Sequence, residues 1–464
     1  TGDGVWSILT QTPQMMNTLF DNENIKSFSM VGCEIASGDV LILVNALTRR
    51  RKNLQSLQLE TCNLDSYGVM YLTSLFKSHP NMAPKCLSLS RNRIGDAGCL
   101  FISEVLMRND VNLEELKLDS NNIGPVGLQL ISCALIGRRR PLQKLSIGNN
   151  YIGDGLTMAF VTPFLSAHDM VPKSLHLDRN GITIIGLSAL LHLLALRDDP
   201  LDELHVGNNY FGNEELQVFP EIFRVNPGAT PKLINLVRMG VDQDGYVALS
   251  ELLRLPNCSL EELVMHQNHP IRDETITHIA TTLETNVNLK HVWLDTSQLS
   301  PIGWDFISKA VCDTSTMTSS FESNHSLITF GNSHDQPDDV IANLGLNDNP
   351  YKDVVACLKV VENHLAWKFH IDKFNEMQPA LLVEFFQFVN KAYVMHENDN
   401  FWMEGEDSDQ NNWLAVHYLI LRNIPAMFDF KPTKTKKKNC EKEMNNQQHC
   451  CTRRCNKECV MVLG

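Results

Sequence analysis

The chain has 464 residues, of which 43% are hydrophobic and 20% are charged, and its formal net charge is −14. This composition is typical of a globular protein, and no apolar run approaches the roughly 18 residues that a membrane-spanning helix needs. The acidic balance disfavours general nucleic-acid binding, which requires basic surface to displace counterions. We therefore expect no nucleic-acid partner and no integral membrane association.

The chain begins at Thr1, and no basic-then-apolar leader follows. We expect a fragment or a processed form, with residues 1–24 forming an N-terminal cap or a partial repeat. From residue 25 the pattern LxxLxLxxNxI recurs in steps of 29 or 30 residues. The ten copies begin at Ile25, Leu54, Pro84, Leu113, Leu142, Pro172, Leu201, Pro231, Leu260 and Leu289. Such a period predicts one α/β solenoid over residues 25–312 instead of the three domains that the length would allow.

Two periodicities follow one another within each copy. Leu116 and Leu118 alternate with polar neighbours, which indicates a short strand. Apolar residues then recur at i, i+1, i+4 and i+5, as in Phe101, Ile102 and Val105, which indicates one apolar face of a helix. A unit this small buries its apolar face only by stacking on its neighbours, so each copy predicts a strand, a turn and a helix.

An asparagine follows most of the predicted strands. Its carboxamide offers a donor and an acceptor to backbone groups that a turn leaves unpaired. The predicted turn ladder consists of Asn92, Asn121, Asn150, Asn180, Asn209 and Asn268. Pro163 and Pro270 interrupt their repeats and mark expected irregular points.

The period and the LxxLxLxxNxI strand resemble the leucine-rich repeat proteins of the ribonuclease-inhibitor type. The resemblance implies a right-handed horseshoe with a concave parallel β-sheet and convex helices. It also implies the intracellular branch of the superfamily, because the disulfide caps of secreted members are absent. Eight of the thirteen cysteines are scattered before residue 360 without a pairing rhythm, which is typical of reduced thiols in the cytoplasm or nucleus.

Polar residues between the inward leucines are expected to line the concave face and to bind a protein partner. The candidate residues on or just after the strands are Glu60, Arg91, Lys117, Asp119, Lys144, His176, Asp178, Arg179, Glu203, His205, Arg238, His266, His291 and Trp293. Trp293 is the expected aromatic anchor among them. The alternative is a solvated ladder in which neighbouring side chains bond one another.

Two of these groups carry separate hypotheses. His176 and His205 occupy the same position of adjacent repeats, but we predict no metal site and no cofactor, because the sequence shows no cysteine or carboxylate at ligand spacing beside them. The arginines at 91, 179 and 238 share one position after their strands. They can meet a carboxylate or phosphate of a partner, although pairing with Asp119 and Asp178 is favoured.

The repeat weakens after residue 312. Residues 313–349 are expected to form a degenerate last repeat with the strand "SNHSLITF", the acidic loop "SHDQPDD" and a cap similar to those of algal leucine-rich repeat proteins. Residues 350–430 are rich in aromatic residues and predict a small α-helical region, either a packed core or a groove for a partner helix.

Residues 431–464 form a basic tail with nine Lys/Arg and three Glu. Disorder is the expected state of this tail. Its other interpretations are a nuclear localisation patch at 434–438, an acylated membrane tether, and a zinc site. The zinc ligands would be Cys440, His449, Cys450, Cys451, Cys455 and Cys459, although the C-x2-C spacing of zinc knuckles is absent.

No catalytic motif is present in the sequence. A search for GxSxG, HExxH, GxxxxGK[ST] and a GxGxxG turn after a strand finds none, so we predict that the protein is not an enzyme. The main hypothesis is an interaction scaffold. The alternatives are a GTPase-activating regulator resembling Ran GTPase-activating protein, from which the basic tail departs, and an enzyme inhibitor that acts by occlusion.

Overall fold

A computed structural model describes residues 24–50, 54–332, 336–360, 363, 364, 381, 384 and 385. The chain divides into two compact units, and the first contains all of these residues up to 315 together with 319–359. The fold described below is that of the first unit.

One parallel sheet of eleven strands runs through this unit in the order of the sequence. Each strand pairs with the strand of the next repeat, so that Leu116 lies opposite Leu87 on one side and Leu145 on the other. The strands are β1 (Ser27–Val31), β2 (Ser56–Glu60), β3 (Cys86–Ser88), β4 (Glu115–Lys117), β5 (Lys144–Ser146), β6 (Ser174–His176), β7 (Glu203–His205), β8 (Leu233–Asn235), β9 (Glu262–Val264), β10 (His291–Trp293) and β11 (Thr329–Phe330).

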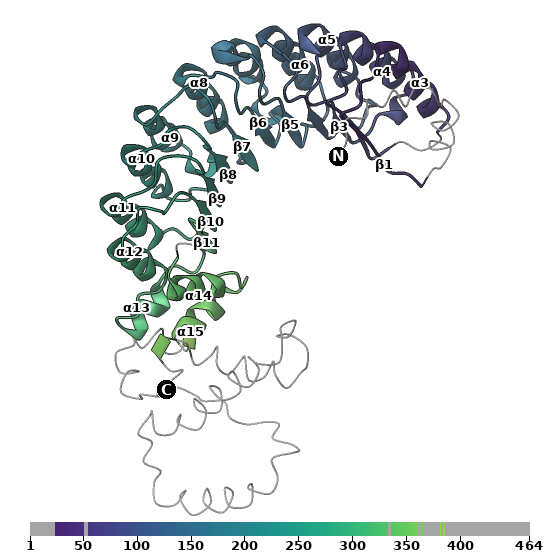
Figure 1. Cartoon of the computed structure of the whole chain (residues 1–464). Coiled ribbons are helices and arrows are strands. Elements are labelled where there is room, and N and C mark those ends of the chain that lie inside the picture. The colour runs from purple at the N-terminus through teal and green to yellow at the C-terminus, as the bar shows by residue number, and fades with distance from the viewer. Residues whose placement is uncertain are drawn as a thin grey trace, which may run out of the picture. The chain divides into compact units, whose positions relative to one another are not determined.

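Helices occupy the outer side of the arc and the strands occupy its inner side (Figure 1). The helices of the repeats are α3 (Ser37–Thr48), α4 (Ser66–Ser78), α5 (Gly95–Leu106), α6 (Pro125–Ile136), α7 (Thr162–Phe164), α8 (Ile184–Ala195), α9 (Val218–Phe223), α10 (Gln243–Leu253), α11 (Asp273–Leu283) and α12 (Pro301–Val311). The α/β leucine-rich-repeat solenoid predicted from the sequence is therefore confirmed.

The core is the leucine-lined layer between the sheet and the helices. Leu116 and Leu118 are fully buried, and so are Leu128 and Ile131 of the facing helix α6. Alternate residues of a strand point to one face of the sheet, and residues i, i+3 and i+4 share one face of a helix. The leucines of both patterns therefore lie in this layer. Neighbouring repeats continue the layer, so no repeat buries its core alone.

The turn after most strands has a left-handed residue that was not predicted from the sequence. Arg91, Ser120, Asn149 and Arg179 have φ between 51° and 58° and directly precede the ladder asparagines. This backbone conformation bends the chain out of the sheet. Asparagine tolerates this conformation better than most residues, but arginine and serine also adopt it here, so residue type alone did not reveal it.

The irregularity expected at Pro163 is confirmed. Its repeat has no long helix, and the convex segment consists of a 3-10 turn (Gly153–Gly155), a π-helical turn (Thr157–Val161) and the three-residue α7. The next repeat has the regular α8, but the repeat that begins at Leu201 is irregular again, with a 3-10 turn (Glu214–Gln217) before the short α9, which contains Pro220. The irregularity expected at Pro270 is wrong for the helix of its repeat, because Pro270 precedes α11 and leaves its eleven residues regular.

The last repeat ends in two helices, α14 (Asp338–Leu346) and α15 (Lys352–Val360). α14 corrects the predicted acidic loop, because Asp338 and Asp339 lie in the first turn of a helix, where carboxylates interact favourably with the helix dipole. A further short helix, α13 (Met317–Glu322), precedes β11. The tail 431–464, most of the helical region 350–430 and residues 1–23 lie outside the described residues. No helix in the described part of the chain is long and apolar enough to cross a membrane.

Candidate functional site

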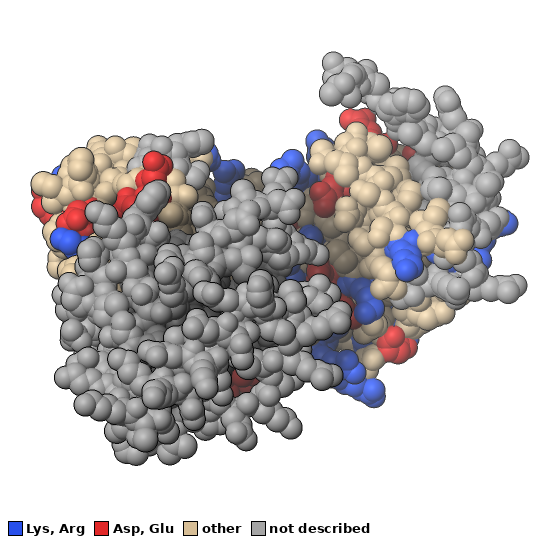
Figure 2. All heavy atoms as spheres, turned by 90° about the horizontal axis from the view of Figure 1, so that it is seen from below, with Lys and Arg blue, Asp and Glu red and all other residues tan. Residues whose placement is uncertain are grey.

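The inner surface of the sheet presents one short row of side chains per strand. The candidate residues on the strands lie here and are mostly half-buried, whereas the leucines between them are buried. Acidic and basic residues are interspersed over the described surface that Figure 2 shows, without a large area of one sign. This surface is suited to a mixed polar and aromatic contact more than to a polyanion.

A cluster of four side chains occupies the middle of this surface. The rings of His176 and His205, which are paired positions on β6 and β7, stack with their centroids 3.7 Å apart. Glu203 Oε2 lies 2.8 Å from His176 Nε2, 3.6 Å from His205 Nε2 and 3.0 Å from Lys144 Nζ. Because an ionised carboxylate only accepts hydrogen bonds, His176 Nε2 carries the proton of that bond. We name these four residues the central cluster.

Burial sets the charge of the central cluster. It lowers the pKa of His176, and burial together with His176 lowers the pKa of His205 to about 4. Burial opposes ionisation of Glu203 too, but hydrogen bonds from His176 and Lys144 outweigh it and bring its pKa to about 2. Both imidazoles are therefore neutral and Glu203 is ionised near neutral pH.

Asp119 and Asp178 lie next to the central cluster and reach across to the following repeat. Asp119 Oδ1 accepts the N–H of Gly148 at 2.8 Å and the hydroxyl of Ser146 at 2.6 Å. Asp178 Oδ1 accepts the N–H of Gly207 at 2.9 Å. A Cβ at Gly148 or Gly207 would lie 3.1 Å from the Oδ1 atom of the aspartate that it binds. Glycine at these two positions therefore leaves room for the carboxylates.

Asp178 corrects the premise on which we excluded a metal site. One ligand atom each from His176, Asp178 and His205 lie within 4.8 Å of one another. A carboxylate is thus present beside the two imidazoles. Asp178 was among the concave-face candidates but was not considered as a ligand. Residues two apart on a strand share a face, so Asp178 lies beside His176, and the in-register neighbour brings His205 to the same place.

A second aromatic group lies near the C-terminal end of the sheet. Trp293 is half-buried between His266 and His291, with ring centroids 5.7 and 6.4 Å away. Its Nε1 donates to Glu262 Oε1 at 3.0 Å, and His291 Nδ1 lies 3.0 Å from the hydroxyl of Thr329. We name His266, His291 and Trp293 the aromatic cluster.

Of the remaining candidates, Glu60 and Lys117 have partners nearby on the sheet, and the three arginines lack the salt bridges that we expected. Glu60 accepts a hydrogen bond from Ser88 at 2.5 Å, and Lys117 lies 3.8 Å from Glu115. No salt bridge within the described residues joins Arg91, Arg179 or Arg238 to Asp119 or Asp178, and Arg238 donates to Gln267. The charge of Arg179 does oppose the rise of the Asp178 pKa that burial causes. Asp119 accepts hydrogen bonds from two serines and Gly148, and Asp178 accepts one from Gly207.

The sequence analysis missed an exposed apolar edge. Tyr151 and Tyr210 directly follow ladder asparagines and are 73% and 77% exposed. Val126 and Ile185, each the second residue of its helix, are also exposed on repeats adjacent to these tyrosines. We name these four residues the apolar edge. The sequence contained a signal for this edge: Tyr151 and Tyr210 stand at a turn position that is held by Gly181 and Gly240 in other repeats.

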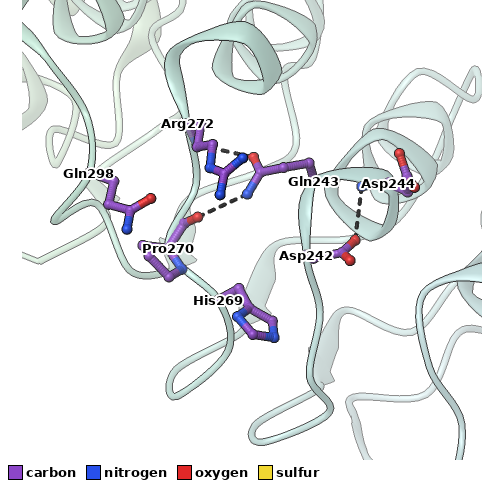
Figure 3. A pocket seen from close by; sticks show the side chains of 7 residues that line it. All are labelled: Asp242, Gln243, Asp244, His269, Pro270, Arg272 and Gln298. Carbon is purple, nitrogen blue, oxygen red and sulfur yellow. Dashed lines mark hydrogen bonds between the residues drawn. The ribbon is translucent and has the colours of Figure 1, made fainter.

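A polar cavity of about 430 Å³ lies among the turns that follow β8, β9 and β10. Figure 3 shows the Gln243 side chain between two turns, where its Nε2 donates to Pro270 O and its Oε1 accepts from Arg272 N. The other lining residues are Asp242, Asp244, His269 and Gln298. Gln243 thus connects two neighbouring repeats. This structural role explains why its side chain lies in the cavity, and no ligand is needed to explain it.

Comparison with known proteins agrees with this geometry. A family model described as "Leucine Rich repeat" matches residues 85–103 and 109–132. Ribonuclease inhibitor of Mus musculus is 23% identical over 334 residues, which cover 70% of this chain and 71% of that protein. This chain is a leucine-rich repeat protein of the ribonuclease-inhibitor type.

Other relatives match a smaller part of their own length. NACHT, LRR and PYD domains-containing protein 3 of Bos taurus is 29% identical over 106 residues, 23% of this chain and 10% of that protein. NACHT, LRR and PYD domains-containing protein 14 of Homo sapiens is 26% identical over 274 residues, 53% of this chain and 24% of that protein. The leucine-rich repeat protein therefore spans a quarter or less of these relatives. An internalin of Listeria monocytogenes superposes with a TM-score of 0.34 and 16% identity, covering 64% of this chain and 92% of that one.

Proposed function

We propose that this leucine-rich repeat protein is a non-catalytic scaffold that binds a protein partner on the concave face of its sheet. The observation that carries the proposal is the aromatic cluster. Trp293 is half-buried on the face of the sheet that points away from the leucine core. Other large side chains of the described residues, such as Phe219 and Tyr246, are fully buried in that core. Tryptophan at such a place is the residue type that dominates binding energy in interfaces.

The dimensions of the sheet suit a folded partner. Eleven strands at a spacing of about 4.8 Å span roughly 48 Å before curvature. A partner domain of about 100 residues has a radius of gyration near 13 Å, and a stable interface needs about 800 Å² on each side. The concave face therefore has room for one such domain.

The apolar edge extends the same proposal. Its residues follow the C-terminal ends of the strands and thus border the concave face. Exposed tyrosines with apolar neighbours are typical of the fully buried centre of an interface after a partner binds. A partner that enters the concavity would cover both the aromatic cluster and this border.

The test is affinity purification from an extract of the source cells with three sets of variants. In the concave variant His266, His291 and Trp293 are replaced by alanine, and in the edge variant Tyr151 and Tyr210 are replaced. The control variant carries Val225→Ala and Val287→Ala, two exposed apolar residues that follow helices α9 and α11 at the opposite edge.

A specific protein that is retained by the control variant and lost by the concave variant supports the proposal. Truncation of a central anchor is expected to cost about 2 kcal/mol or more, which weakens binding by at least roughly 30-fold. Retention of that protein by the concave variant and loss by the edge variant would place recognition on the edge. Retention by both variants would contradict the proposal for the described surface.

Inhibition of an enzyme by occlusion is the second candidate, and the mouse relative favours it. That relative is named ribonuclease inhibitor, and its alignment covers 71% of its length. A titration of a ribonuclease with this chain tests the candidate directly. A fall in ribonuclease activity that saturates at one equivalent of the chain would support inhibition. Unchanged ribonuclease activity would contradict inhibition and leave the scaffold proposal as it stands.

Acceleration of GTP hydrolysis in a small GTPase is the remaining alternative. The arginines at 91, 179 and 238, which have no ion pair in the described residues, are the groups that this activity would use. Single-turnover GTP hydrolysis with and without the chain separates this activity from a scaffold, because a scaffold leaves the rate unchanged.

A further inference from the structure

The strongest unassigned group of side chains on the molecule is the part of the concave face between β6 and β7. His176 and His205 lie on paired positions of the two strands, and Asp178 lies two residues after His176 on the same face. Their ligand atoms lie within 4.8 Å of one another. Two imidazoles and one carboxylate form a ligand set that zinc and related ions take in three-residue sites.

We propose that His176, His205 and Asp178 bind a divalent transition-metal ion, with zinc as the reference ion. This inference does not rest on the proposed function, because ion binding is measured without a protein partner. Zinc–nitrogen bonds of about 2.0–2.1 Å place tetrahedral ligand atoms roughly 3.4 Å apart. The ligand atoms lie within 4.8 Å of one another, so they must approach by up to about 1.4 Å. Because the two rings are stacked at an interplanar angle of 21°, at least one ring must also rotate to direct its lone pair at the ion.

The hydrogen bonds around the histidines suit ligation. Glu203 accepts the proton of His176 Nε2 at 2.8 Å, which leaves Nδ1 with a free lone pair. A carboxylate that holds the second nitrogen of a ligand histidine is the usual support of such a site. Lys144, at 3.0 Å from Glu203, fixes the carboxylate in turn.

His205 offers a nitrogen with no other role. Its Nε2 is buried and makes no hydrogen bond within the described residues, and the nearest carboxylate oxygen, of Glu203, is 3.6 Å away. Its Nδ1 lies 3.1 Å from the Asn235 amide. Asn235 Oδ1 accepts the N–H of Val237 at 3.0 Å, so the amide nitrogen of Asn235 donates to His205 Nδ1. Ligation through Nε2 therefore requires that this hydrogen bond breaks and that the ring proton moves to Nδ1.

The local charge also favours a cation. Three carboxylates, those of Asp119, Asp178 and Glu203, surround the two histidines, and Lys144 and Arg179 are the cations that face them. Burial raises the pKa of Asp178 to about 6, because its carboxylate is removed from water without a close ion pair. Its bond to Gly207 uses Oδ1 and leaves the lone pairs of Oδ2 for a ligand. A divalent ion would offset this desolvated negative charge.

The experiment uses the full chain with the five tail cysteines, 440, 450, 451, 455 and 459, changed to serine, because those thiols are competing ligands. The chain is stripped with a chelator and titrated with Co2+ and Zn2+. The test variants are His176→Gln/His205→Gln, Asp178→Asn and Glu203→Gln. The matched control is His266→Gln/His291→Gln, two histidines on the same face outside the site.

The chain with the five tail cysteines changed to serine is expected to bind one equivalent of Co2+. Its spectrum should show ligand-field absorption and no thiolate-to-cobalt charge-transfer band. The double-histidine variant loses this equivalent, Asp178→Asn weakens it at least about tenfold, and Glu203→Gln weakens it by about 10- to 100-fold. The control keeps it. Equal binding by the double-histidine variant and the control overturns the proposal, and so does a thiolate band that accounts for all the bound cobalt.

A second measurement keeps the test valid if the double variant does not fold. In the chain with its native histidines, Zn2+ is expected to shift the ring C–H signals of two of the sixteen histidines in NMR spectra. The single variants His176→Gln and His205→Gln identify those signals by their loss. If no histidine signal shifts at saturating Zn2+, the proposal is wrong.

Discussion

The ladder asparagines connect neighbouring repeats as well as turning the chain. Asn150 Oδ1 accepts the N–H groups of Asn121 and Ile123 in the preceding repeat, both at 2.9 Å. Its Nδ2 donates to Leu118 O of that repeat and to Ile147 O of its own. The carboxamide thus uses both of its ends on backbone groups, all of them buried, that water cannot reach.

Asn150→Ala is expected to lower the free energy of unfolding by about 1–3 kcal/mol, because two buried N–H groups lose their acceptor. Chemical denaturation measures this change. The control is Gln298→Ala, an exposed residue after the last strand of the regular repeats, which should change stability by less than about 0.5 kcal/mol. Equal effects of the two substitutions would contradict the role of the carboxamide.

Leu118 tests the core at the same scale. It is fully buried between the sheet and the helices. Leu118→Ala removes that volume and is expected to cost about 2–5 kcal/mol, which thermal unfolding would detect. Lys117→Ala, at the adjacent residue whose side chain is on the concave face, is the matched control. An unchanged melting temperature in Leu118→Ala would contradict the assigned strand orientation.

Helices are tied together by a second set of contacts, which recurs in every second repeat. Asp96, at the start of α5, accepts the N–H groups of Gly124 and Gly127 at the start of α6. Asp154 does the same with Thr183 and Gly186. Asn213 and Asp273 also accept N–H groups from the repeat that follows them. A carboxylate near the N-terminus of the next helix also interacts favourably with its dipole.

Gly127 makes this contact possible. A Cβ at this position would lie 2.5 Å from Asp96 Oδ1 and 2.8 Å from Ile123 Cγ2. Gly127→Ala is therefore expected to destabilise the fold by about 1–3 kcal/mol through overpacking. Gly137→Ala, where the Cβ meets one backbone oxygen at 3.7 Å, should be neutral or stabilise by up to about 1 kcal/mol. Urea unfolding of both variants checks the sign, and equal effects would refute the contact.

At the scale of the molecule, the end of the solenoid is closed by a buried lysine. Lys359 of α15 donates to Val311 O and Asn324 O, both at 2.6 Å, and so joins the last helices to the final repeats. Burial, together with repulsion from Lys352, lowers the pKa of Lys359 to about 7, although Cys312 opposes the shift. The folded chain therefore releases this proton far more readily than the unfolded chain.

This difference predicts how stability depends on pH. Between pH 7 and the ordinary lysine pKa of about 10.4, the unfolded chain binds more protons than the folded chain, so the contribution of Lys359 to stability rises with pH. Below pH 7 both states are protonated and its contribution is constant. Lys359→Met should abolish this slope in denaturation measured from pH 7 to 10. Lys26→Met, at an exposed lysine of the first repeat, is the control, and an unchanged slope in Lys359→Met would disprove the assignment.

The repeat, its strands and most of its helices could be predicted from the sequence, because each depends on periodicity within about 30 residues. α14 was missed because its acidic start is typical of a loop as well as of a helix N-terminus. In the site, the histidine pair followed from the shared repeat position of His176 and His205. The roles of Asp178 and Asp119 did not, because they depend on glycines one repeat further along the chain.

The sequence by itself therefore determined the solenoid, its parallel sheet and its buried leucines, since identical units that cannot bury their apolar faces alone must stack on one another. Only the tertiary structure decided which polar side chains meet. Beyond the histidine pair, the stacking places Gly148 and Gly207 where they leave room for the carboxylates of Asp119 and Asp178. The same stacking exposes Tyr151 and Tyr210 at the edge. These contacts join residues about 30 positions apart, a distance over which local sequence preferences carry no information on side-chain proximity.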